Sequence, residues 1–259
     1  MLKPSAGARP RLLFYALLVA LALLPWVGNP YHVSLLVVVG IHTIIAVGLC
    51  LLMGYAGQVS LGHAAFYGLG AFTSGILSAS YGVSPWLGIL LGVAASSGLA
   101  YVTGGPILRL RGHYLAMATL GFGIILYILM VELKDFTGGP SGLSGIPSLA
   151  IGGLVFVDSR PGRALRAIHG SEAAAQSLGV DVDRFKLMVF VLSAAYAALA
   201  GGLYAHYTTF ISPQPFGFMF SVRLVLMVVI GGMASIWGAI FGSATLTVLG
   251  ELLHPFGDL

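Results

Sequence analysis

The amino-acid sequence predicts an all-α, polytopic transmembrane helical bundle of about eight spans. Of its 259 residues, 58% are hydrophobic and only 8% are charged, whereas a soluble domain carries about 25% charged residues. The apolar residues gather in runs of about 20, the length that a helix needs to cross the hydrocarbon core. Most lysines and arginines lie in clusters between these runs. We therefore treat residues 1–259 as one transmembrane domain.

The predicted spans follow one another with mostly short connections. Residues 12–27 form the first span and end at Gly28, Asn29 and Pro30. No small-residue cleavage pattern follows closely, so we interpret this run as a retained span and not as a signal peptide. The later predicted spans are residues 33–53, 64–80, 85–104, 114–131, 187–207 and 224–249. The single cysteine, Cys50, excludes an intrachain disulfide.

The basic clusters predict the orientation, because cytoplasmic loops of membrane proteins are enriched in lysine and arginine. The clusters are Lys3, Arg9 and Arg11; Arg109 and Arg111; and Arg160, Arg163, Arg166, Arg184 and Lys186. The first cluster places the N-terminus in the cytoplasm, and four spans return the chain there at the second. The same rule accounts for the net charge of +4, so we expect no nucleic-acid partner.

One predicted crossing is too short. Residues 133–148 should lie outside and the loop 158–186 inside, which leaves residues 149–157 to cross the membrane. Nine residues of helix cover about 14 Å of a hydrocarbon core of about 30 Å. Either this segment is re-entrant or a span is missing near residues 152–158. We favour a missing span, because the alternation of sides is consistent elsewhere.

The loop 158–186 is the most informative extramembrane piece. Leu165, Ile168, Ala175 and Leu178 recur at helical spacing, and Gly179 is placed to end a short helix. The segment around residues 171–179 is small and rich in alanine, which suits a helix that docks in a partner's groove. A solvated loop is the alternative, and the pattern alone does not separate the two.

Residues 54–72 bring Gln58, Ser60, His63 and five glycines into an apolar chain. Non-helical backbone at membrane depth survives only where protein buries it or where it lines a water-filled cavity. We consider three interpretations: a segment that re-enters or packs beside the translocation path, polar residues that pack helices together, and a plain loop. The first makes these three residues candidates for lining the path.

Other polar residues receive simpler interpretations. His42 and His206 are expected to face other helices and form hydrogen bonds there. Arg223, at the start of the predicted last span, is expected to extend its charged head to the interface, and Glu251 is expected near a cytoplasmic end. The scattered histidines have no ligand-like spacing, so no metal site is predicted.

An enzyme is disfavoured. Residues 142–145 read Gly-Leu-Ser-Gly, as around the serine of intramembrane serine proteases, and His206 is the base that the chain offers. A nucleophilic serine needs that base within hydrogen-bond reach. Ser144, however, lies in a loop of turn residues with Pro147 close behind it.

Four segments together resemble one family. They are GYAGQVSLGHAAFYGLGAF (residues 54–72), TGGPSGLSGIP (137–147), the run from Arg160 through the following helix, and GGMASIWGAIFG (231–242). In this order they resemble the LivM-type permeases of branched-chain amino acid ABC transporters. The resemblance covers nearly the whole chain from the second span to Glu251. The short crossing departs from it, because a full span precedes the arginine-rich loop in that family.

The resemblance implies an inner-membrane importer subunit of bacteria. It implies a second related permease, two ATPase subunits on the cytoplasmic face and a periplasmic substrate-binding protein. The family's coupling motif corresponds to Glu172, Ala173, Ala174 and Gly179, with Arg163 in the preceding arginine-rich run. The sequence has no GxxxxGK[ST] motif. No cofactor is therefore expected in this chain, and ATP and Mg²⁺ are expected in the ATPase subunits.

Two alternatives remain open. A permease of the same superfamily for urea, short amides or another amino acid would present similar motifs. An ion-coupled secondary transporter would need no ATPase, but it would be expected to carry charged or carbonyl-lined ion sites within the membrane. No acidic residue lies inside a predicted span.

Overall fold

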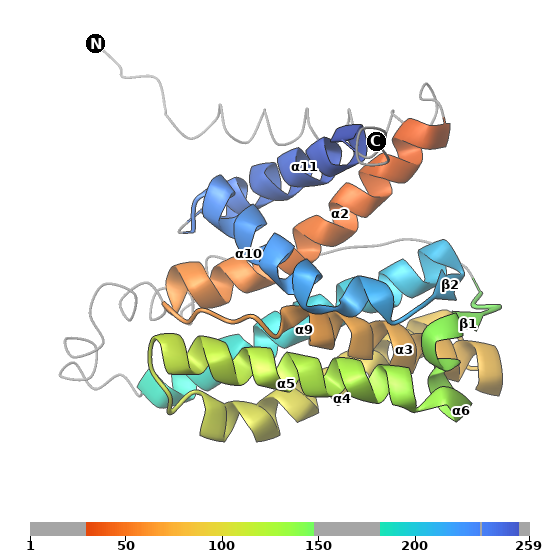
Figure 1. Ribbon diagram of the computed structural model, residues 1–259, viewed down its shortest axis with the longest axis horizontal. Coiled ribbons are helices and arrows are strands. Elements are labelled where there is room, and N and C mark those ends of the chain that lie inside the picture. The colour runs from red at the N-terminus through yellow and green to blue at the C-terminus, as the bar shows by residue number, and fades with distance from the viewer. Residues whose placement is uncertain (1–29, 148–181, 234, 254–259) are drawn as a thin grey trace, which may run out of the picture.

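The computed structural model describes residues 30–147, 182–233 and 235–253, and within them the long helices run side by side (Figure 1). The long helices are α2 (Pro30–Cys50), α3 (His63–Tyr81), α4 (Pro85–Ile107), α5 (His113–Glu132), α9 (Val182–Thr208), α10 (Phe218–Gly231) and α11 (Ile236–Leu253). A π-helical turn, η1 (Leu51–Tyr55), extends α2. The short elements are α6 (Lys134–Thr137), η2 (Gly139–Ser141), β1 (Leu143–Ser144), β2 (Phe210–Ile211) and η3 (Gln214–Phe216).

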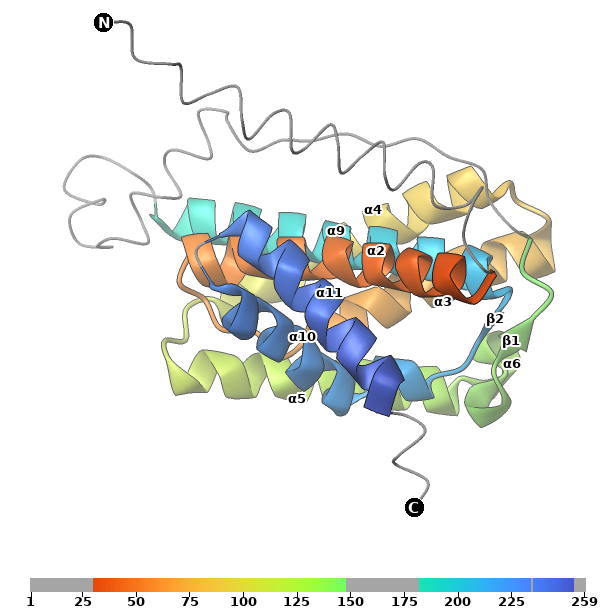
Figure 2. The same ribbon diagram turned by 90° about the horizontal axis from the view of Figure 1, so that it is seen from above.

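The bundle has two distinct ends. At one end β1 pairs with β2 in antiparallel register, Leu143 opposite Ile211, and we call this the sheet end. The opposite end carries Arg109, Arg111, Arg184 and Lys186, and we call it the basic end. The view in Figure 2 shows the starts of α5 and α9 at this second end.

The structure confirms most of the predicted spans. Within the described residues, five stretches are long and apolar enough to cross a membrane: Tyr31–Tyr55, Pro85–Ile107, His113–Glu132, Val182–Thr208 and Ile236–Leu253. The predicted first span, residues 12–27, lies outside the described residues. One boundary is corrected: residues 182–186, assigned to the cytoplasmic loop, form the first turn of α9.

The predicted span 224–249 is wrong, because the chain turns back within it. It contains the end of α10 and most of α11, which form a hairpin. A Cβ on Gly238 would lie 1.9 Å from the carbonyl oxygen of Gly231, and one on Gly242 would lie 2.0 Å from that of Met227. The backbones therefore touch, as small residues at a helix interface allow.

Because of this hairpin, Glu251 lies at a different end of the bundle from the one expected. A carboxylate oxygen of Glu251 accepts a hydrogen bond of 3.1 Å from the Tyr31 hydroxyl, at the first turn of α2. The thiol of Cys50, near the other end of α2, contacts the carbonyl oxygen of Met233 at 3.2 Å. Glu251 therefore lies at the sheet end, opposite Arg109, Arg111, Arg184 and Lys186, so the expectation that it lies on the same side as these basic residues is not met.

Pro147 and Val182 lie at opposite ends of the bundle. The Nδ1 of His206, close to the end of α9, donates to the carbonyl oxygen of Pro147. Val182 begins α9 at the basic end, and this helix of 27 residues is about 40 Å long. The alternation of sides predicts these opposite positions for Pro147 and Val182, and the predicted crossing, residues 149–157, lies outside the described part.

The core of the bundle is the close packing of α3 on α9. Small residues allow it: a Cβ on Gly70 would lie 2.3 Å from the carbonyl oxygen of Ala198, and one on Gly201 would lie 1.9 Å from that of Tyr67. The ring of Tyr67 packs against Phe216 and Phe220, with centroids 5.1 and 5.2 Å away. This packing holds the start of α10 against α3.

Candidate functional site

The candidate site begins where α2 loses its regular winding. In the π turn, the Ala56 amide donates to the carbonyl oxygen of Leu51 at 3.2 Å, five residues back. The Gln58 amide then donates to the carbonyl oxygen of Leu52 at 3.0 Å. Gly57 has a φ of +64°, which favours glycine. Together these features turn the chain out of the helix, and residues 57–62 are non-helical.

The segment from Ala56 to Gly62 re-enters the bundle. The hydroxyl of Ser193 donates to the carbonyl oxygen of Gly48 at 2.7 Å and also lies 2.5 Å from Nε2 of His63. His63 is thus level with Gly48, which precedes the end of η1 by about 10 Å of helix. The chain has therefore folded back into the bundle and does not form a surface loop.

The geometry assigns the protonation of His63. The Ser193 hydrogen is directed at Gly48, so the Ser193 oxygen accepts from Nε2–H of His63. Nδ1 then carries no proton and accepts from the Ser60 hydroxyl at 3.0 Å. The Ser60 oxygen in turn faces the Gly62 amide at 3.4 Å. The neutral imidazole of His63, which is 1% exposed, therefore links the segment to α9 directly and to α2 through Ser193.

Gln58, Ser60 and His63 are all buried, at 6%, 2% and 1% exposure. The Gln58 side-chain amide donates to the carbonyl oxygen of Ala56 at 3.3 Å. The backbone is held by hydroxyls of other helices: Leu61 N–H donates to Thr119 Oγ1 at 3.1 Å and Ala64 N–H to Ser221 Oγ at 3.2 Å. Two of the three predicted residues are thus brought together, while Gln58 bonds only locally.

Sequence reasoning did not identify Ser193, Thr119 or Ser221, which complete the site. Single hydroxyl residues are common in membrane helices and carry no spacing signal. For Ser193 the sequence did carry one signal: this residue precedes the small-residue stretch AAYAALAGG of α9, and small residues allow helix backbones to approach closely.

The segment leads to a junction of two helices that begin inside the bundle. α3 starts at His63, and α10 starts at Phe218 after the extended residue Gly217. α10 has 14 residues, about 21 Å, which is shorter than a hydrocarbon core of about 30 Å. The Ala64–Ser221 hydrogen bond joins the two first turns, and neither helix has a side-chain N-cap.

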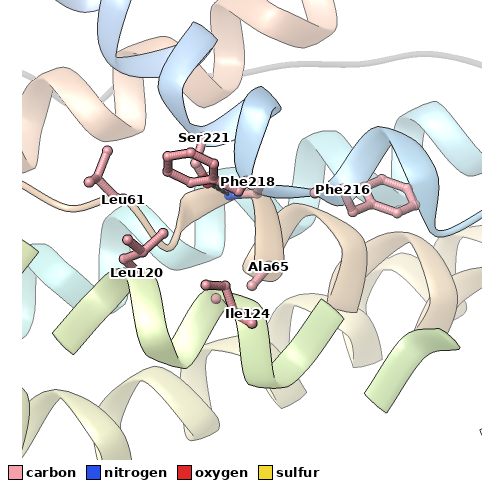
Figure 3. Close-up of a pocket in the computed structure, with 10 residues that line it drawn as sticks. Leu61, Ala65, Leu120, Ile124, Phe216, Phe218 and Ser221 are labelled. Carbon is pink, nitrogen blue, oxygen red and sulfur yellow. Dashed lines mark hydrogen bonds between the residues drawn. The ribbon is translucent and has the colours of Figure 1, made fainter. Parts of the chain in front are cut away.

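A small pocket of about 10 Å³, room for about one water molecule, lies at this junction (Figure 3). Its walls come from α3, α5, η3 and α10 and from the re-entrant segment; the labelled side chains are Leu61, Ala65, Leu120, Ile124, Phe216, Phe218 and Ser221. Helix N-termini carry partial positive charge, and the remaining walls are mostly apolar. As it stands the pocket is too small for a solute larger than water, but its chemistry would suit an anionic group beside an alkyl group if the helices moved apart. Interrupted helices form substrate sites in secondary transporters.

The protease interpretation fails on geometry. Ser144 is exposed in β1, opposite Phe210. The two nitrogens of His206 are occupied by the carbonyl oxygen of Pro147 and by the Ser74 hydroxyl, the latter at 2.7 Å. His42 bonds Thr247 of α11 at 2.9 Å, so both intramembrane histidines face other helices as predicted.

Comparison with known proteins defines the class. The family model "Branched-chain amino acid transport system / permease component" matches residues 31–156 and 149–258. The LivM permease proteins of the high-affinity branched-chain amino acid transport systems of Salmonella typhimurium and Escherichia coli are each 32% identical over 301 residues, covering 98% of this chain and 71% of the relative. The LivH permease protein of Escherichia coli is 26% identical over 254 residues, covering 83% of this chain and 82% of the relative. No solved structure matches.

The chain belongs to the branched-chain amino acid permease family, and more particularly it is similar to the LivM-type members. The alignment with LivM runs over 301 residues, more than the 259 of this chain, so the relative carries internal residues that this chain lacks. The two matches to the family model meet at residues 149–156. The longer alignment supports residues missing from this chain, and the overlap of the two family matches lies at the predicted short crossing, residues 149–157.

Proposed function

We propose that this chain is the membrane-spanning permease subunit of an ATP-binding-cassette importer that carries leucine, isoleucine and valine across the inner membrane. The observation that supports it most is the similarity over 98% of the chain to permeases named for branched-chain amino acid transport. The second support is the architecture, in which α3 and α10 begin inside the bundle at an apolar pocket.

The basic end is proposed to face the cytoplasm. It carries four basic residues, Arg109, Arg111, Arg184 and Lys186, with Asp183 as the nearby acid. The sheet end carries Glu132, Asp135 and Glu251 against Lys134. Positive charge concentrates on the cytoplasmic side of bacterial membrane proteins. The N-terminus, one span before α2, is then cytoplasmic as well.

The translocation path is proposed to run beside the re-entrant segment, with Gln58, Ser60 and His63 close to it. The pocket at the junction is nearly closed, so transport requires α3, α5 and α10 to move apart. Alternating access would be a shift between inward-open and outward-open states, biased by subunits that bind the two states with different affinity.

ATPase coupling is assigned to the basic end, by way of Glu172, Ala173, Ala174, Gly179 and Arg163. These residues lie outside the described part, and their role rests on the resemblance of their motif. Two ATPase subunits, using ATP and Mg²⁺, a second related permease and a periplasmic binding protein would complete the importer. Replacing Glu172 or Gly179 should release the ATPases or uncouple them while the permease stays in the membrane. Normal copurification and transport in these variants would contradict the coupling role.

Uptake by cells that produce the chain with its neighbouring transport genes tests the function. We expect ATP-dependent uptake of labelled leucine that unlabelled isoleucine and valine compete away. Uptake of urea or a short amide without uptake of leucine would point to a relative with another substrate. Uptake that persists without the ATPases and responds to an ion gradient would overturn the importer.

Cysteine labelling tests the path. With Cys50 replaced by alanine, Gln58→Cys should react with a small membrane-permeant thiol reagent at a rate that changes when the importer turns over. Val59→Cys is the matched control, because Val59 is the neighbouring residue and is 42% exposed. Equal and constant labelling of both positions would remove Gln58 from the path.

A further inference from the structure

A second, larger hollow lies on the other face of α10. It has a volume of about 830 Å³ between α2, α9, α10 and α11, and we call it the α10–α11 groove. Most of its lining is aliphatic or aromatic: Val38, Met219, Phe220, Leu226, Leu246, Leu249 and Leu253. Its polar residues include Thr208, Gln214 and Arg223. Figure 1 shows α10 and α11 meeting near the basic end and diverging toward the sheet end.

Arg223 gives the groove a charge. It is the sixth residue of α10 and shares the groove with His42, which lies about halfway along the span formed by α2 and η1. Its backbone is therefore at membrane depth, and the predicted position at the start of a span is wrong. The guanidinium extends toward Gly250, near the end of α11: a Cβ on Gly250 would lie 3.6 Å from a guanidinium nitrogen.

No carboxylate of the described residues forms an ion pair with Arg223. Glu251 follows Gly250 in the sequence, but its carboxylate accepts a hydrogen bond from the Tyr31 hydroxyl instead. A charged side chain at membrane depth is costly and is normally paired. Arginine matches the oxygens of a phosphate with two parallel hydrogen bonds.

We propose that the α10–α11 groove binds an anionic phospholipid. The Arg223 guanidinium holds the phosphate, Gln214 and Thr208 lie at the headgroup level, and an acyl chain follows Met219, Leu226 and Leu246 toward His42. The size of the groove favours this occupant over an amino acid, and the direction of Arg223 toward the sheet end places the phosphate where headgroups lie. This site is independent of the proposed translocation path, which lies on the opposite face of α10.

The test uses the permease complex, reconstituted in vesicles of phosphatidylglycerol and phosphatidylcholine and then extracted in mild detergent for native mass spectrometry. The complex should retain phosphatidylglycerol preferentially. Arg223→Gln should reduce the retained phosphatidylglycerol about tenfold, the size expected for a charge-assisted hydrogen bond, and Arg223→Lys should restore part of it. Lys134→Gln, a charge removed at the sheet end outside the groove, is the matched control and should change nothing.

Three results would overturn the proposal. Equal phosphatidylglycerol retention by Arg223→Gln and the parent would show that the guanidinium holds no lipid. Displacement of the lipid by leucine would assign Arg223 to the substrate. A high yield of cross-links between Leu249→Cys and cysteines placed in residues 12–27 would show that the chain itself fills the groove. Thermal melting of each variant confirms that it is folded.

Discussion

Ser193→Ala should destabilise the permease measurably, because one hydroxyl joins three parts of the structure. It donates to the carbonyl oxygen of Gly48 in α2 and accepts from His63 at the start of α3. Ser96→Ala is the matched control. Ser96 is also fully buried in a helix, but its hydroxyl has no hydrogen-bond partner among the described residues.

The magnitude follows from the two lost bonds. Side-chain hydrogen bonds between membrane helices average about 0.6 kcal/mol and reach about 1.7 kcal/mol. The change also leaves Nε2–H of His63 buried without an acceptor, which costs about 1–3 kcal/mol. We therefore expect Ser193→Ala to lower the free energy of unfolding by about 1–3 kcal/mol. Ser96→Ala removes an unsatisfied group and should be neutral or slightly stabilising.

Equilibrium unfolding of the purified permease in mixed detergent micelles measures both variants. A double-mutant cycle with His63→Ala separates the contribution of the Ser193–His63 pair, and the interaction energy should be at least about 0.5 kcal/mol. If Ser193→Ala and Ser96→Ala agree within about 0.3 kcal/mol, the assigned network is wrong.

Two further predictions concern the packing and the sheet end. Gly201→Ala should lower the melting temperature sharply, because its Cβ would lie 1.9 Å from the carbonyl oxygen of Tyr67. Gly98→Ala is the control, because a Cβ there would have nothing within 4 Å, and it should be neutral or stabilising. Similar melting temperatures of the two variants would contradict the close contact of α3 and α9. His206→Leu should loosen the loop of residues 133–147, because His206 donates a hydrogen bond to Pro147. Limited proteolysis should then cleave this loop faster than in the parent protein. An unchanged cleavage rate would show that other contacts hold the loop.

Most of the fold could be predicted from the sequence, because in lipid only a long apolar run can form a spanning helix. Residues 85–104 and 114–131 were located within a few residues of α4 and α5 for this reason. The hairpin of α10 and α11 was missed because hydropathy finds apolar runs but not an uncharged turn within one. Its turn follows Gly232, with a φ of +100°, in a stretch without charges, so hydropathy does not mark it.

The candidate site could be predicted in part. Polarity in an apolar setting drew attention to Ser60 and His63, which do lie together. Ser193, the partner of His63, and Ser221, which accepts from the Ala64 amide, are more than 100 residues away in sequence. Only the tertiary fold brings these hydroxyls to the same depth, and a single sequence carries no record of that proximity.

The short length of α10 has a consequence for biosynthesis. Helix α10 has 14 residues and follows the non-helical Gly217, so it is too short to be inserted alone as a spanning helix. The backbone groups before it lack helical hydrogen bonds and cannot face lipid. It can enter the membrane only where α3 and α9 already provide protein surface. We expect α10 and α11 to be inserted together, late, against a preassembled N-terminal part, so that truncation before α11 would leave α10 outside the bilayer.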